Sequence, residues 1–255
     1  MNRAKARVLL VGVGGLGCPS ALVLARAGVA SIAIADDDVV EETNLHRQIL
    51  FDEADVGAPK AEVAARALER LASREGFQAF AIGSRFLPHN AVQLAQSADV
   101  VVEGSDNFAT KFLVADACAI AGVPVVHAAA VRWGGTVLAV GPRGGPCYRC
   151  LFEDIPRAGA PNCADAGVIG PMVGVVAALQ ADLALALIEG EPVEGTLVTF
   201  DGLTDALRRR TISTREDCAL CGRAQRIDRI DASRYVTDEC MDDGTPSSQI
   251  IIENV

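Results

Sequence analysis

Aromatic residues are scarce in this sequence, at 4% of 255 residues with a single tryptophan. Half of the residues are nevertheless hydrophobic, so the core must consist mainly of alanine, valine, leucine and isoleucine. Such side chains suit a parallel sheet that is buried under helices on both faces. The length permits one large α/β domain, alone or with an appendage, and we find no internal repeat or low-complexity linker.

Basic residues are also few relative to acidic ones, at 23 against 33, which gives a formal net charge of -10. This balance argues against nucleic acid or an acidic membrane surface as the main partner. A polyphosphate ligand would therefore need its own local cluster of lysine and arginine. The most apolar segment, residues 167–190, is interrupted by Gln180, Asp182 and Glu189. Since charged groups are costly in lipid, we predict a buried helix there and no membrane span.

A secretory signal is missing as well, since residues 1–7 are basic and lead directly into an apolar run. We therefore expect a cytoplasmic protein. The sequence contains eight cysteines, which in such a compartment argue against a disulfide framework. Their spacing is more informative than their number.

Four cysteines form two Cys-x-x-Cys pairs, Cys147 with Cys150 and Cys218 with Cys221. Four thiolates match the tetrahedral coordination of structural zinc, and the wide separation of the pairs means that the ion would join distant parts of one fold. The alternatives are a redox pair or cysteines that simply pack in the core. Because both pairs lie in Gly/Pro-rich or polar turns, we favour a closed, structural zinc site.

Short apolar runs alternate with helical patterns over the first half of the chain. We predict strands over residues 8–11, 31–35, 77–82, 100–102 and 125–129. We predict helices over residues 19–27, 61–71, 89–97 and 108–121. From residue 134 the pattern changes to strands at 136–140, 196–200 and 207–212 and a long buried helix at 170–189. The predicted fold is a doubly wound, Rossmann-like, mostly parallel α/β sheet that antiparallel strands continue.

A glycine loop follows the first predicted strand, with glycines at positions 12, 14, 15 and 17. Glycines at the exit of a buried strand allow a tight turn and let backbone amides approach a phosphate at the start of the next helix. An acid at the end of the second strand, here Asp36, is typical of NAD or FAD binding. Taken alone, this pattern favours a dinucleotide.

Further charged residues change that preference to a nucleoside triphosphate. Arg47 and Lys60 supply positive charge for a polyphosphate, and Asp106 is a carboxylate at a strand end that suits Mg²⁺. Asp36 and Asp38 can bind ribose hydroxyls or orient neighbouring groups. Charge neutralisation and a metal bridge are the main requirements of phosphoryl or nucleotidyl transfer, whereas a nicotinamide site needs neither the second acid nor such a lysine.

Together these motifs resemble the HesA/MoeB/ThiF family, bacterial relatives of the ubiquitin-activating enzymes. The resemblance covers about residues 7–222 and rests on motifs in the family's order and spacing: Gly12-x-Gly14-Gly15-Leu16-Gly17, Asp36-x-Asp38, Asn44-Leu45-x-Arg47-Gln48, Pro59-Lys60, Ser105-Asp106-Asn107 and the paired cysteines. It implies an adenylyltransferase that activates the C-terminal glycine carboxylate of a ubiquitin-like sulfur carrier ending in diglycine and releases pyrophosphate. It also implies a homodimer.

The resemblance assigns roles to individual positions. Asp36, Asn44, Arg47 and Lys60 would hold ATP, with Arg47 and Lys60 also catalytic, and Asp106 would bind Mg²⁺. The four paired cysteines would bind Zn²⁺. Residues 1–130 would form the nucleotide-binding half and residues 131–222 the zinc-bearing, carrier-binding half, followed by a tail at 223–255 for which the sequence suggests no role.

Cys163 is the most consequential cysteine outside the zinc set. In thiamine-pathway members the cysteine at this position takes part in sulfur transfer, and a bystander thiol is an equal alternative here. We favour the thiamine branch because of its similar runs at residues 35–38, 48–51 and 170–175. Activation of the molybdopterin synthase small subunit is a second possibility for the function. The family's N-terminal arginine segment has no counterpart here, because Arg3 and Arg7 lie too close to the first strand. A non-catalytic nucleotide-binding protein therefore stays open, as does an NAD-linked oxidoreductase.

Overall fold

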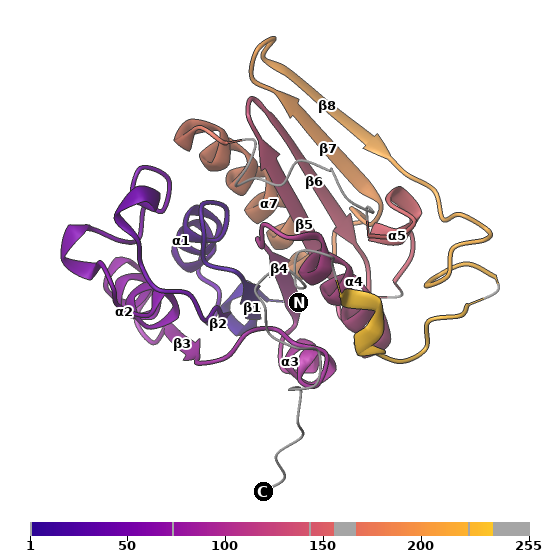
Figure 1. The fold of residues 1–255 in the computed structure, drawn as a ribbon, viewed down its shortest axis with the longest axis horizontal. Helices are drawn as coiled ribbons and strands as arrows, with labels where there is room; N and C mark the ends of the chain where they lie inside the picture. The colour runs from indigo at the N-terminus through magenta and orange to yellow at the C-terminus, as the bar shows by residue number, and fades with distance from the viewer. Residues whose placement is uncertain (1, 73, 143, 156–166, 224, 237–255) are drawn as a thin grey trace, which may run out of the picture.

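Eight strands form one sheet in the computed structural model, which describes residues 2–72, 74–142, 144–155, 167–223 and 225–236 (Figure 1). Their order across the sheet is β3-β2-β1-β4-β5-β6-β7-β8. The parallel strands are β1 (Arg7–Val11), β2 (Ser31–Ala35), β3 (Gln78–Ile82), β4 (Val100–Glu103) and β5 (Val125–Val131). The antiparallel strands are β6 (Gly134–Val140), β7 (Thr196–Asp201) and β8 (Ala206–Thr211). The predicted fold class is confirmed.

Helices cover both faces of the sheet (Figure 1). On one face lie α1 (Gly17–Ala27), α2 (Lys60–Leu71) and α7 (Gly170–Glu189). On the other lie α3 (Ala91–Gln96), α4 (Phe108–Ala121) and the short α5 (Tyr148–Leu151). Four single turns of 3₁₀ helix complete the described elements: η1 (Arg3–Lys5), η2 (Glu42–Asn44), η3 (Glu53–Asp55) and η4 (Ala232–Tyr235). Two apolar cores result, one on each side of the sheet.

Helix α7 is long and apolar enough to cross a membrane by length and composition, yet it packs on β4, β5 and β6 beside α1. Its buried Gln180 donates hydrogen bonds to the carbonyl oxygens of Glu103 (2.7 Å) and Val126 (2.9 Å). The same side chain accepts a hydrogen bond of 2.8 Å from Ser20 on α1. These bonds fix the helix on the sheet as a core element, as predicted.

Element ends differ from the sequence-based boundaries by a few residues. Strands β5 and β6 extend into their hairpin because Ala130 pairs with Gly135 and Val131 with Gly134. Helix α2 begins at Lys60, one residue before the predicted start, and Pro59 is its N-cap. Proline suits that place because it has no N–H that would need a partner inside the helix.

The chain beyond residue 222 also packs on the fold. Ile227 and Tyr235 are buried in the core that contains α4 and α5. The described part of the chain therefore continues as a folded segment to residue 236, past the end of the family resemblance. Cys163, the predicted sulfur-transfer residue, lies outside the described residues.

Candidate functional site

The carboxyl ends of the central parallel strands meet where the strand order reverses, between β1 and β4. Gly12 follows β1 and donates its N–H to Ala35 at the end of β2, at 3.0 Å. Gly104 follows β4 and donates to Val11 at 2.9 Å. Such a reversal point is where open α/β sheets bind ligands. Asp36 and Asp106 follow β2 and β4, so the predicted site residues of these two strands lie at this edge.

The glycines of the loop differ in what they do. Gly12 has a φ of +85°, and a Cβ atom there would lie 3.1 Å from the backbone of Gly104. A Cβ at Gly17 would lie 2.1 Å from the carbonyl oxygen of Gly12, which real structures do not tolerate. At Gly14, by contrast, the nearest atom would be Nε2 of Gln48 at 3.8 Å. Gly12 and Gly17 are required by the fold, whereas Gly14 keeps one side of the loop open to a ligand.

Asp36 supports the loop from the end of β2. Its carboxylate accepts hydrogen bonds from the backbone N–H of Val13 (2.7 Å) and of Asp38 (3.0 Å). Burial raises the pKa of Asp36, although these two hydrogen bonds act in the opposite direction. The residue therefore holds two turns together and presents its remaining lone pairs at the strand ends.

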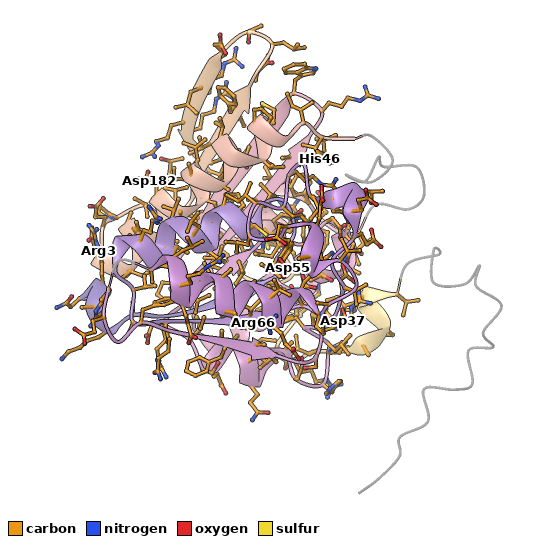
Figure 2. All side chains as sticks on the ribbon, turned by 90° about the vertical axis from the view of Figure 1, so that its left-hand side faces the viewer. Arg3, Asp37, His46, Asp55, Arg66 and Asp182 are labelled. Carbon is orange, nitrogen blue, oxygen red and sulfur yellow. The ribbon has the colours of Figure 1, made fainter. Side chains whose placement is uncertain are left out.

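The two predicted cations lie close to this loop. A Cβ at Gly15 would lie 3.3 Å from Cδ of Arg47, so the arginine side chain runs across the loop. Lys60, at the start of α2, is buried, and its Nζ lies 2.9 Å from Asp38. Asn44 donates a hydrogen bond of 2.9 Å to Glu41. In Figure 2, Asp37 and His46 mark this end of α1 and α2, while Arg3 marks the opposite end.

Arg3 and Arg7, the two N-terminal arginines, form their ion pairs away from the glycine loop of their own chain. Arg3 forms an ion pair with Glu189 at the end of α7. Arg7 forms a bidentate pair with Asp99, with distances of 3.2 and 3.0 Å. Arg3 precedes β1, Arg7 is the first residue of β1, and Asp99 precedes β4. These contacts therefore lie at the amino ends of the strands.

Asp106 is exposed and lies beside a cavity of about 190 Å³. Among the hydrogen bonds and ion pairs of the described residues, none joins Asp106 to Arg47 or Lys60. The cavity is mostly apolar, and Asp106, Lys111 and His127 are among its polar lining residues. Its other lining residues are Phe108, Ala128, Ala129, Val131, Thr136, Leu138, Tyr148, Leu151, Phe152 and Leu197.

Beside the cavity lies a buried polar cluster that the sequence analysis missed. Glu103 accepts hydrogen bonds from Lys111 Nζ (2.8 Å) and from the backbone N–H of Ser105 (2.7 Å). Nδ1 of His127 lies 3.3 Å from the same carboxylate. Burial alone would raise the pKa of Glu103, but the charge of Lys111 and the bond with His127 lower it to about 2. Burial lowers the pKa of His127.

One atom of this cluster lacks a partner. Nε2 of His127 is buried and makes no hydrogen bond within the described part of the chain. An unsatisfied buried polar atom costs about 1–3 kcal/mol, so it calls for an explanation. The sequence did contain a signal: Glu103 ends an apolar strand, and parallel pairing of β4 with β5 places it opposite His127.

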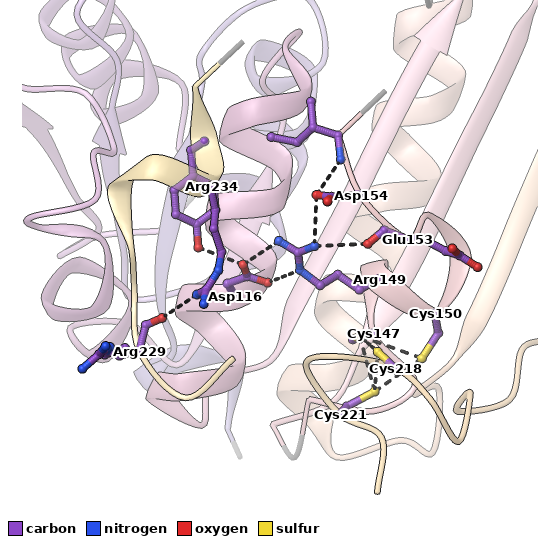
Figure 3. Close-up of polar contacts among 12 residues, drawn as sticks. Asp116, Cys147, Arg149, Cys150, Glu153, Asp154, Cys218, Cys221, Arg229 and Arg234 are labelled. Atoms are coloured by element: carbon purple, nitrogen blue, oxygen red, sulfur yellow. Dashed lines mark hydrogen bonds and ion pairs between the residues drawn. The ribbon is translucent and has the colours of Figure 1, made fainter. Parts of the chain in front are cut away.

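The four paired cysteines form a single cluster, as predicted (Figure 3). Cys147 Sγ lies 3.5 Å from Cys218, 3.9 Å from Cys150 and 3.4 Å from Cys221. Four sulfurs bound to one zinc ion at about 2.3 Å would stand about 3.8 Å apart, so the cluster fits a tetrahedral ion. The hydrogen bond between Cys147 and Cys221 raises the pKa of Cys147 and lowers that of Cys221 to about 5. A bound Zn²⁺ would hold all four as thiolates and join α5 to the turn at residues 218–221.

Arg149 lies on α5 between Cys147 and Cys150 and ties this helix to α4 (Figure 3). Its guanidinium forms a bidentate pair with Asp116, at 2.7 and 2.9 Å, and lies 4.7 Å from the ring centroid of Phe112. The hydroxyl of Tyr235 donates to the same carboxylate at 2.8 Å. Asp116 therefore joins three distant parts of the chain.

Comparison with known proteins identifies the family. The model of the ThiF family matches residues 3–221. The chain belongs to the ThiF family. The SAMP-activating enzyme E1 of Haloferax volcanii is 40% identical over 236 residues, which cover 90% of this chain and 85% of that protein. This ThiF-family chain is thus related to E1-like adenylyltransferases, as the sequence resemblance indicated.

Other relatives of this ThiF-family chain are longer. The adenylyltransferase and sulfurtransferase MOCS3 of Bos taurus is 44% identical over 230 residues, covering 87% of this chain but 49% of that protein. The chain therefore spans about half the length of the MOCS3 relatives it matches. Among solved structures, Escherichia coli MccB with ATP has a TM-score of 0.70 at 25% identity, covering 86% of this chain and 68% of that one.

Proposed function

We propose that this chain uses ATP to adenylate the C-terminal glycine carboxylate of a ubiquitin-like sulfur carrier and releases pyrophosphate. The observation that carries the proposal is the arrangement at the β1 exit: a glycine loop open at Gly14, with Arg47 across it and Lys60 buried beside Asp38. Membership of the ThiF family and the ATP complex of MccB support it. A dinucleotide oxidoreductase has no such support.

In the proposed reaction the chain's main task is to screen charge. A carboxylate is a poor nucleophile toward a triphosphate, because both carry negative charge. Arg47 and Lys60 would lower that repulsion, with Lys60 exchanging Asp38 for a phosphate oxygen, and Asp106 would hold Mg²⁺. Asp36, Asp38 and Asn44 would bind the nucleoside or orient the residues that do. Mg²⁺ held by Asp106 would supply positive charge that neutralises the leaving pyrophosphate.

The cavity beside Asp106 is the place we propose for the carrier's tail. It opens next to the proposed metal ligand, and its apolar walls suit an extended segment that ends in two glycines. Residues 1–130 would then bind the nucleotide and line one side of this cavity, while residues 131–222 would line the other side, bind the body of the carrier and hold zinc.

The pathway of the carrier is a finer proposal. The sequence favours a thiamine-pathway carrier with Cys163 as the sulfur-transfer residue. The name of one relative, SAMP-activating enzyme E1, favours a SAMP-type carrier. The family resemblance adds a molybdopterin-type carrier as the third possibility. We propose a ubiquitin-like sulfur carrier as the class of partner. One experiment with thiamine-type, SAMP-type and molybdopterin-type carriers distinguishes among the three. Wild-type sulfur transfer by a Cys163→Ser variant would exclude a covalent role for that thiol.

Exchange of labelled pyrophosphate into ATP tests the activity. We expect exchange only when a carrier ending in diglycine is present, with carriers of all three types assayed in parallel. Lys60→Ala and Asp106→Ala should each abolish it, whereas Lys5→Ala, which changes an exposed lysine of η1, should not. ATP binding without exchange for every carrier would instead support a non-catalytic nucleotide-binding protein.

We also propose a cytoplasmic homodimer. One face of α7 is exposed within the chain, where Val175 is 40% exposed and a Cβ at Gly174 would meet no atom within 4 Å. Small residues on a helix allow close packing against a second copy. Sedimentation of wild type and of a Gly174→Glu variant tests this, and equal masses for the two would contradict the proposed contact.

A further inference from the structure

His127 lies at the point where the buried polar cluster meets the cavity. Its Nδ1 faces Glu103 at 3.3 Å, and its ring stacks at a tilt on Tyr148, with 4.7 Å between ring centroids. Nε2 is on the opposite side of the ring from the atom that bonds Glu103. The residue is 2% exposed, so bulk water does not satisfy Nε2.

The surroundings decide which nitrogen carries the proton. Lys111 donates to Glu103 at 2.8 Å and to the carbonyl oxygen of Ala128 at 2.7 Å, which keeps Glu103 ionised. Burial lowers the pKa of His127, so its ring is neutral at pH 7. A neutral imidazole has one N–H, and beside a carboxylate that N–H is at Nδ1. Nε2 therefore offers a lone pair and can only accept a hydrogen bond.

We propose that Nε2 of His127 accepts a hydrogen bond from the peptide N–H of the carrier's terminal glycine and so orients the carboxylate beside Asp106. This inference rests on the proposed function. Carboxylate and triphosphate oxygens are acceptors at pH 7 and cannot pair with the lone pair. The backbone N–H groups of the tail are donors, and an apolar cavity would otherwise leave them unpaired.

A matched set of variants separates the two ring nitrogens. His127→Asn keeps an N–H for Glu103 but has no atom in the place of Nε2, while His127→Gln places an acceptor oxygen near it. We expect His127→Asn to raise the KM for the carrier by about 10- to 100-fold and to leave the KM for ATP within about twofold. His127→Gln should recover most of this loss. His89→Asn, at an exposed histidine, is the control.

A second measurement needs no variant. A semisynthetic carrier whose last amide is replaced by an ester lacks the N–H in question. With wild-type protein it should show the same loss in pyrophosphate exchange as the normal carrier shows with His127→Asn. Combining ester and variant should add little further loss, because both remove one hydrogen bond.

Spectroscopy gives a readout independent of activity. The chain has only three histidines, so the ¹⁵N resonances of His127 can be assigned by substitution. We expect an unprotonated Nε2 whose resonance shifts when the normal carrier binds but not when the ester carrier binds.

The outcomes separate the two proposals. Exchange that is indifferent to the ester, or a folded His127→Asn variant with an unchanged carrier KM, overturns the role of His127 alone. An absence of exchange with every carrier refutes the proposed function, and the role of His127 falls with it. If His127→Asn does not fold, the ester carrier and the wild-type protein decide.

Discussion

At the scale of single residues, the glycines of one loop are present for different physical reasons. Gly17 is fixed by the fold, because an added Cβ would meet the carbonyl oxygen of Gly12 at 2.1 Å. We expect Gly17→Ala to lower the free energy of unfolding by about 1–3 kcal/mol or more, as overpacking does. Gly14→Ala should leave it within about 0.5 kcal/mol, since its nearest neighbour would be 3.8 Å away.

The variants Gly17→Ala and Gly14→Ala separate an effect on folding from an effect on ligand binding. Urea unfolding of both variants measures the free energy of unfolding, and calorimetric titration of Gly14→Ala measures its affinity for ATP. We expect the methyl group at position 14 to weaken ATP binding at least about tenfold, because it occupies the side on which a phosphate would approach the loop amides. Unchanged ATP affinity in Gly14→Ala would place the nucleotide elsewhere.

At the scale of elements, α5 is too short to hold its place by itself. Its four residues are bounded by Cys147 and contain Cys150, and both reach across the chain to the turn that holds Cys218 and Cys221. We expect about one zinc ion per chain by elemental analysis. Removal by a strong chelator should lower the melting temperature, because zinc binds the folded cluster and its binding free energy stabilises the fold.

Two substitutions make the metal prediction specific. Cys150→Ser should lose zinc and melt at a lower temperature, while Cys118→Ala, at a buried cysteine of α4 outside the cluster, should retain the full zinc content. A zinc content of zero in the wild-type protein, purified without chelators, would favour the redox pair that the sequence left open.

Elements were predictable where one local pattern determines them. The run Val100–Val102 is apolar on both faces and had to be a buried strand, and the helix at 108–121 was found to the residue because Asn107 and Gly122 cap it. The cluster of Glu103, Lys111 and His127 was not found. Its members come from β4, α4 and β5, and only their register brings them together. The glycine loop and the cysteine pairs are contiguous motifs, whereas this cluster is not.

At the scale of the whole molecule, the segment at 225–236 returns to the core and stabilises the zinc-bearing part. Tyr235 is 8% exposed and donates to Asp116 at 2.8 Å, and Asp116 also holds Arg149 of α5. The sequence did not predict this contact, because residues 116 and 235 are 119 positions apart and no motif marks either. The connection makes the segment part of the fold that supports α5.

A double-mutant cycle on Tyr235 and Asp116 measures what this connection contributes to stability. Tyr235→Phe removes one hydrogen bond and should lower the free energy of unfolding by about 0.5–1.5 kcal/mol. Asp116→Asn leaves the buried guanidinium of Arg149 without its carboxylate and should cost about 3–5 kcal/mol. Because the tyrosine acts through the carboxylate, Tyr235→Phe should cost little more in the Asp116→Asn background. Urea unfolding of the four proteins tests this, and strictly additive losses would mean that the segment is held by packing alone and contributes nothing through Arg149.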